Sequence, residues 1–170
     1  MQRFMGKVVL VTGAGSGIGK ASALRLAAEG GSIFCVDLNR EAVESAAAEI
    51  TAEGGVATPW VCDVGNEASV QEAVGACIEG YGSLYGVVNM AGILRFDDTE
   101  ELQTDDWQKV IDINLTGSMF LCRAALPHLV ETKGSIVNAA STAALSGLPC
   151  GLAYSASKGG VLAMTRSIAV

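Results

Sequence analysis

Tyr154 and Lys158 stand four residues apart in the stretch Tyr-Ser-Ala-Ser-Lys, a spacing that places two side chains on one face of a helix. A phenol titrates near pH 10, so a tyrosine that acts as a base near neutrality needs its anion favoured by about three pH units, or about 4 kcal/mol. The Lys158 ammonium can supply this stabilisation. The pair predicts a tyrosine acid/base, although the same spacing is common in exposed helical pairs without chemistry.

A glycine-rich turn follows the first apolar run of the chain and reads Thr-Gly-Ala-Gly-Ser-Gly-Ile-Gly from Thr12 to Gly19. Such glycines permit a tight bend and let the backbone approach a pyrophosphate, while the free amides of the following helix favour the anion. The turn therefore predicts a phosphate-binding loop, with a flexible glycine loop as the alternative. A nucleoside triphosphatase P-loop is disfavoured, because Gly13 and Gly19 are six residues apart rather than five and Ala21 follows Lys20.

An acid, Asp37, ends the second apolar run, 18 residues after Gly19. In a dinucleotide-binding βαβ unit, an acid near this position accepts hydrogen bonds from the adenosine ribose of NAD and repels the extra phosphate of NADP. Asp37 therefore favours NAD over NADP, while the nearby Arg40 argues in the other direction. Read alone, Asp37 is also compatible with an ordinary acid at the end of a strand.

Apolar runs of strand length alternate with stretches of helical period, which is typical of parallel strands joined by crossover helices. We expect strands at residues 7–11, 32–36, 56–62, 84–89 and 135–140, and helices that start at Asn39 as a cap and at Thr104. The strands lack clean polar alternation, as expected where helices cover both faces of a sheet. We predict one α/β domain over residues 1–170, a Rossmann-like doubly wound parallel sheet of order 3-2-1-4-5 in three αβα layers.

Together these motifs resemble the classical branch of the short-chain dehydrogenase/reductase family, whose turn reads TGxxxGxG. A second family signature, NNAG, stands here as Asn89-Met90-Ala91-Gly92, with methionine replacing the second asparagine. The resemblance identifies a catalytic tetrad of Asn114, Ser141, Tyr154 and Lys158. It also implies a set of cofactor-binding residues, namely Gly13, Ser16, Gly17, Ile18, Gly19, Asp37, Asp63, Val64, Asn89, Ala91, Gly92, Tyr154 and Lys158.

The resemblance implies an NAD(H)-dependent oxidoreductase that interconverts a secondary alcohol and a ketone. In that reaction Tyr154 exchanges the proton, Lys158 lowers the pKa of Tyr154, and Ser141 polarises the substrate oxygen. Asn114 would hold a water that links Lys158 to solvent. The identity of the substrate stays open at this point.

Classical family members continue through a sixth and a seventh strand, whereas this sequence stops at Val170, inside the helix expected from Tyr154. We therefore expect that the carboxyl-terminal part of the family domain is missing. Two alternatives stay open: a nucleotide-binding module without catalysis, and a structural partner for another chain. Because the family commonly forms tetramers or dimers, we expect a homo-oligomer.

The composition argues against several other classes of protein. With 11 basic and 18 acidic residues the net charge is -7, and no basic cluster is visible, so nucleic acid is not an expected partner. The uncharged stretch from Gly134 to Ser157 is interrupted by polar residues, so we predict no membrane span. One histidine and five widely spaced cysteines without a CxxC pair predict no metal site and reduced thiols, as in the cytoplasm.

Overall fold

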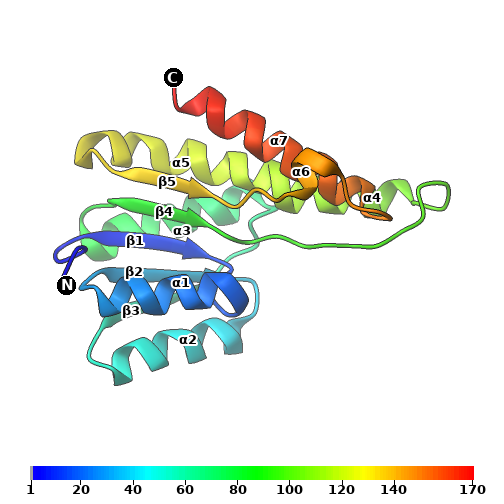
Figure 1. The fold of residues 1–170 in the computed structure, drawn as a ribbon. Helices are drawn as coiled ribbons and strands as arrows, with labels where there is room; N and C mark the ends of the chain where they lie inside the picture. Colours follow the sequence, from blue (N-terminus) through cyan, green and yellow to red (C-terminus); the bar gives the residue numbers. More distant parts are fainter. Residues whose placement is uncertain (1) are drawn as a thin grey trace.

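Five parallel strands form the central sheet of the computed structural model, which describes residues 2–170 (Figure 1). They are β1 (Val8–Thr12), β2 (Ser32–Asp37), β3 (Val56–Val61), β4 (Gly86–Asn89) and β5 (Ser135–Asn138). The strands lie in the order β3-β2-β1-β4-β5, and every neighbouring pair is parallel. The predicted Rossmann-like order 3-2-1-4-5 is therefore confirmed.

Helices connect the strands and cover both faces of the sheet (Figure 1). They are α1 (Gly17–Ala28), α2 (Arg40–Ala52), α3 (Glu67–Tyr81), α4 (Thr104–Ile111), α5 (Gly117–Thr132), α6 (Ala143–Ser146) and α7 (Leu152–Ile168). A π-helical segment, η1 (Asp112–Thr116), joins α4 directly to α5. Neither η1 nor the short α6 is among the elements that the sequence predicts.

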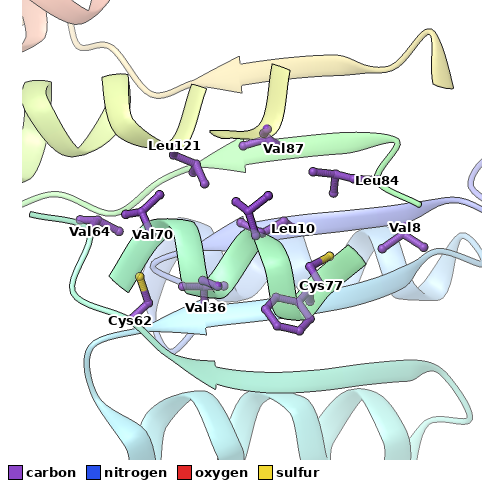
Figure 2. Packing of buried hydrophobic residues seen from close by; sticks show 14 of the residues in the cluster. Val8, Leu10, Val36, Cys62, Val64, Val70, Cys77, Leu84, Val87 and Leu121 are labelled. Atoms are coloured by element: carbon purple, nitrogen blue, oxygen red, sulfur yellow. The ribbon is translucent and has the colours of Figure 1, made fainter. Parts of the chain in front are cut away.

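The side chains of β1 alternate between two hydrophobic clusters, one on each face of the sheet. Leu10 packs with Val70 of α3 and Leu121 of α5 in the larger cluster, which Figure 2 shows from close by. Val11 packs on the opposite face with Ala23 of α1 and with apolar side chains of α2. Full burial of one such aliphatic side chain contributes about 1.5–3 kcal/mol. Burial on both faces explains why the strands lack polar alternation.

The predicted element boundaries hold to within two residues. Asn39 caps α2 as expected, because its side chain accepts a hydrogen bond of 3.1 Å from the Ala42 amide. Helix α4 begins at Thr104 as predicted, and Gln103 occupies the cap position before it. The strand expected from residue 84 begins at Gly86, although the Tyr85 amide already bonds to the Val8 carbonyl at 2.8 Å.

Side-chain hydrogen bonds hold the carboxyl ends of β1, β4 and β5 side by side. The Thr12 hydroxyl donates to Asn89 Oδ1 at 3.0 Å and accepts bonds of 3.1 Å from the Met90 and Ala91 amides. Asn89 Nδ2 in turn donates to Asn138 Oδ1 at 3.3 Å. This bracing fixes the edge of the sheet from which the glycine turn and the segment after β4 emerge.

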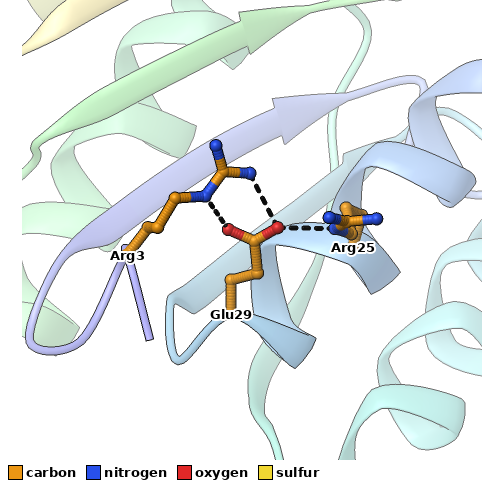
Figure 3. A network of polar contacts seen from close by, with 3 residues as sticks. All are labelled: Arg3, Arg25 and Glu29. Atoms are coloured by element: carbon orange, nitrogen blue, oxygen red, sulfur yellow. Dashed lines mark hydrogen bonds and ion pairs between the residues drawn. The ribbon is translucent and has the colours of Figure 1, made fainter. Parts of the chain in front are cut away.

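A three-residue ion cluster fixes the amino-terminal segment to the end of α1, where Arg3 and Arg25 approach the buried Glu29 carboxylate (Figure 3). Arg3 Nη2 donates to Glu29 Oε1 at 2.7 Å. The hydrogen bonds from Arg3 and then Arg25 lower the pKa of Glu29 from 4.5 to about 2. The folded-state pKa therefore lies below the unfolded value, so the stabilisation is present above about pH 4.5 and is lost as the pH falls towards 2.

We expect Glu29→Gln to lower the midpoint of thermal unfolding at pH 7, because it removes the carboxylate from two guanidinium groups. The difference from the parent protein should shrink as the pH falls from 4.5 towards 2, where Glu29 of the parent becomes protonated. Thermal melts monitored by circular dichroism across this pH range would measure it. Glu44→Gln is the control, because Glu44 pairs with Arg40 at an exposed position, and it should change little. A difference that stays constant down to pH 2 would contradict the assignment.

Candidate active site

A cavity of about 490 Å³ opens along the carboxyl-terminal edge of the sheet, where the β1–α1 turn, the ends of β2 and β3 and the start of α7 meet. Ligands of open α/β sheets bind at this edge. The predicted site residues that line the cavity are Gly13, Ser16, Gly17, Ile18, Gly19, Asp37, Asp63, Val64, Ala91, Gly92, Tyr154 and Lys158. The structure thus brings the glycine turn, both acids and the Tyr154 and Lys158 pair around one cavity.

The glycine turn is closely packed at two of its positions. Gly13 has a φ of +65°, which favours glycine, and a Cβ there would lie 3.1 Å from the Ala91 amide. A Cβ on Gly19 would lie only 2.1 Å from the Gly13 carbonyl oxygen, so no larger residue fits without a backbone shift. Helix α1 begins immediately after Ser16, and its first amides make this end of the cavity favourable for an anion.

Asp37 is held at the cavity wall by backbone amides on either side of it. Its Oδ2 accepts a hydrogen bond of 2.9 Å from Gly15, and its Oδ1 accepts one of 3.0 Å from Asn39. A Cβ on Gly15 would lie 2.9 Å from Asp37 Oδ2 and 2.7 Å from the Ala42 side chain. The glycine at position 15 therefore lets the turn approach the carboxylate.

Lys158 is buried beside Tyr154, with 5% of its surface exposed. Its ammonium donates a hydrogen bond of 2.7 Å to the Ala139 carbonyl and lies 5.8 Å from the centroid of the Tyr154 ring. Burial lowers the pKa of Lys158, because a charge is disfavoured away from water. The pair predicted from the sequence is thus not an exposed helical pair, since the ammonium is enclosed next to the phenol.

Asn114 lies in η1, is fully buried and does not line the cavity. Its Oδ1 accepts a bond of 2.8 Å from the Ile93 amide, and its Nδ2 donates to the Ile93 carbonyl at 2.9 Å and to Ser157 Oγ at 3.1 Å. A Cβ on Gly92 would lie 3.1 Å from Asn114 Oδ1 and 3.6 Å from Lys158 Nζ. Asn114 Oδ1 and Lys158 Nζ therefore both lie close to Gly92, with Lys158 lining the cavity and Asn114 behind its surface.

Ser141 and Asn89 also lie outside the residues that line the cavity. Ser141 follows β5, and its half-buried hydroxyl accepts a bond of 3.1 Å from the Ala143 amide at the start of α6. Asn89 is buried among the bracing bonds between β1, β4 and β5. The cofactor contact predicted for Asn89 and the substrate contact predicted for Ser141 stay predictions.

Other lining residues are missed by the sequence interpretation: Val36, Leu38, Cys62, Met90, Ile93, Leu94, Ile113, Ala139 and Ala140. Most of them are chain neighbours of predicted site residues, such as Leu38 beside Asp37 and Cys62 beside Asp63, so adjacency is a signal that could have found them. Ile113 comes from η1 and is likewise the chain neighbour of the predicted Asn114.

Comparison with known proteins identifies the family of the chain. A family model described as short chain dehydrogenase matches residues 7–170. The chain belongs to the short chain dehydrogenase family. This short chain dehydrogenase is 42% identical over 168 residues to D-threitol dehydrogenase of Mycolicibacterium smegmatis, covering 98% of the chain and 65% of that protein. It is also 42% identical over 171 residues to 3beta-hydroxysteroid dehydrogenase of Mediterraneibacter gnavus, covering 100% of the chain and 62% of that protein.

Among solved structures, this short chain dehydrogenase resembles NAD+-bound xylitol dehydrogenase, with a TM-score of 0.94 and 40% sequence identity. The match covers 98% of the chain and 65% of xylitol dehydrogenase. The chain thus spans less than two thirds of the length of these relatives. Among residues 2–170, no helix combines the length and apolar character needed to cross a membrane.

Proposed function

We propose that this protein is an NAD(H)-dependent oxidoreductase that interconverts a secondary alcohol and a ketone. The observation that carries the proposal is the buried Lys158 ammonium, 5.8 Å from the Tyr154 ring, in a cavity that also contains the glycine turn and Asp37. A buried cation beside a phenol favours the phenolate, which is the form that a tyrosine base needs. The names of the relatives, which are dehydrogenases of alcohols, agree with this proposal.

The residues around the cavity fit a nicotinamide dinucleotide. The glycine turn at the start of α1 lines the cavity, where the helix amides favour a pyrophosphate, and Asp37 offers carboxylate oxygens to a ribose. When bound, the dinucleotide supplies the hydride acceptor or donor. No metal is part of the proposal.

Each tetrad residue then has a role that its contacts permit. Tyr154 Oη accepts the hydroxyl proton of the alcohol, and the Lys158 ammonium is the neighbouring cation. Because Ser141 Oγ accepts its bond from Ala143, its own hydrogen is free to be donated to the substrate oxygen. Both Nδ2 hydrogens of Asn114 are used, but Oδ1 keeps one lone pair for the proposed relay water, beside Gly92 and Lys158.

Preference for NAD over NADP is part of the proposal, and Asp37 supports it. Asp37→Asn removes the negative charge that would repel the extra phosphate of NADP, while the side chain keeps its size. We expect the affinity for NADH to fall roughly tenfold and the preference to move towards NADPH. Fluorescence titration with both cofactors measures this ratio.

The matched control for this change is Asp105→Asn, which removes an exposed acid from the first turn of α4, outside the cavity. It should leave the affinity for both cofactors unchanged. An unchanged NADH to NADPH ratio in the Asp37 variant would argue against the role of Asp37.

The test of the proposed function is NADH binding by fluorescence together with turnover on a panel of linear and cyclic secondary alcohols and ketones. Binding together with turnover supports the oxidoreductase. Binding without turnover across the panel would favour the second candidate, a nucleotide-binding module. Absence of both would favour a structural partner for another chain.

A homo-oligomer in the cytoplasm completes the proposal. Cys35, Cys62, Cys77 and Cys122 are buried free thiols, which suits a reducing compartment. The oligomeric state rests on the family resemblance, and light scattering after size exclusion would measure it.

A further inference from the structure

Ser157 is a fully buried residue of α7, one position before Lys158 and three after Tyr154. Its hydroxyl donates a hydrogen bond of 2.7 Å to the main-chain carbonyl of Tyr154. The same hydroxyl accepts the bond of 3.1 Å from Asn114 Nδ2. One oxygen atom therefore connects the turn of α7 that carries Tyr154 to the buried asparagine of η1.

The connection extends to a third element, because Asn114 exchanges two hydrogen bonds with the backbone of Ile93, of 2.8 and 2.9 Å. Ile93 lines the cavity in the segment after β4. Asn114 and Ser157 are fully buried, so a lost partner leaves a buried polar group of either side chain unsatisfied. These hydrogen bonds thus connect the segment after β4, η1 and the turn of α7 that carries Tyr154.

We infer that Ser157 is a positioning residue for Tyr154, fixing the acid/base turn of α7 against Asn114 and the Ile93 segment. The inference rests on the proposed function, since it assigns a role in that reaction. Thr165 offers an internal comparison: its hydroxyl donates to the Val161 carbonyl at 2.7 Å and accepts 3.0 Å from Asn138. Helix α7 is therefore attached at two positions by a hydroxyl that donates within the helix and accepts from an asparagine of another element. Of these two positions, Ser157 is the one next to Tyr154.

The chain offers a matched control two residues away. Ser155 lies on the same helix, and its hydroxyl is the buried side-chain oxygen without a hydrogen-bond partner among the described residues. Ser155→Ala and Ser157→Ala thus remove the same atom from the same helix, but only Ser157→Ala breaks a connection between elements. Alanine has the higher intrinsic helix propensity, so both variants should keep α7 helical.

The experiment compares kcat, KM and NADH affinity of both variants with the parent protein, and measures hydrogen exchange of the Ile93 amide by NMR. We expect Ser157→Ala to lower kcat roughly 10- to 100-fold, because a displaced catalytic group loses its reactive geometry. NADH affinity should stay within about twofold, and Ile93 exchange should rise about tenfold as its partner loosens. Ser155→Ala should leave kcat and Ile93 exchange within about twofold of the parent.

Equal kcat in the two serine variants, beside an active parent protein, would overturn this inference alone. Faster Ile93 exchange in Ser157→Ala with an unchanged kcat would overturn it too, because the bond chain would then be structural only. If the parent and Tyr154→Phe proteins turned over at the same rate, the proposed function would fail, and the role of Ser157 in it would fail with it.

Discussion

Replacing Tyr154 with phenylalanine is expected to lower kcat roughly 10²- to 10⁴-fold, the contribution typical of a positioned proton-transfer group. The change removes one hydroxyl from a half-buried ring whose centroid lies 5.8 Å from the Lys158 ammonium. Because the ring itself remains, the packing of α7 and the shape of the cavity should persist. NADH should therefore bind within about threefold of the parent affinity while turnover is lost.

The control for this prediction is Tyr85→Phe. Tyr85 precedes β4, and its ring lies 4.0 Å from Lys7 Nζ, away from the cavity residues. That variant also loses one phenolic hydroxyl next to a lysine, so it matches the chemical change without touching the site. Steady-state assays should give it the kcat of the parent. Retained turnover in the Tyr154 variant, or an equal loss in the Tyr85 variant, would remove Tyr154 from the mechanism.

Local signals in the sequence predicted the parts of the fold that depend on neighbouring residues. Asn39 caps α2 because a cap needs only the next turn of helix, and the glycine turn lies between β1 and α1 because its bend is set within eight residues. Asp37 reaches the cavity because the carboxyl end of a parallel strand opens at the ligand edge of the sheet. These features follow from short-range geometry.

Local sequence signals did not predict the contacts between residues that are distant in the sequence. The Asn114 and Ser157 side chains meet across 43 positions, and Thr12 and Asn89 meet across 77. The π-helical turn of η1 is equally hidden, since it depends on how α4 and α5 meet the rest of the domain rather than on a residue pattern. For this reason the family resemblance identifies Asn114 as a tetrad residue, but nothing in the sequence indicates that Ile93 and Ser157 are its partners.

Gly19→Ala is expected to reduce NADH affinity at least 100-fold. A Cβ at this position would lie 2.1 Å from the Gly13 carbonyl oxygen, 2.6 Å from the Gly13 carbonyl carbon and 3.1 Å from the Thr12 oxygen. All three are backbone atoms, so no side-chain rotation relieves the overlap and the turn must move away from α1. The amides that favour a pyrophosphate would then leave their positions at the cavity. Overpacking of this kind also costs about 1–3 kcal/mol of unfolding free energy.

Gly19→Ala is expected to change both stability and binding. Its control must therefore place a Cβ equally close to a backbone carbonyl oxygen, but at a position outside the cavity. Gly134 does so: a Cβ there would lie 2.1 Å from the Tyr85 carbonyl oxygen, just before β5 and away from the cavity. Gly134→Ala should lose comparable stability in urea unfolding, while its folded fraction binds NADH with the parent affinity. Weak binding in both variants would mean that Gly19→Ala acts through stability, whereas weak binding in Gly19→Ala alone assigns the cofactor phosphates to the turn between β1 and α1.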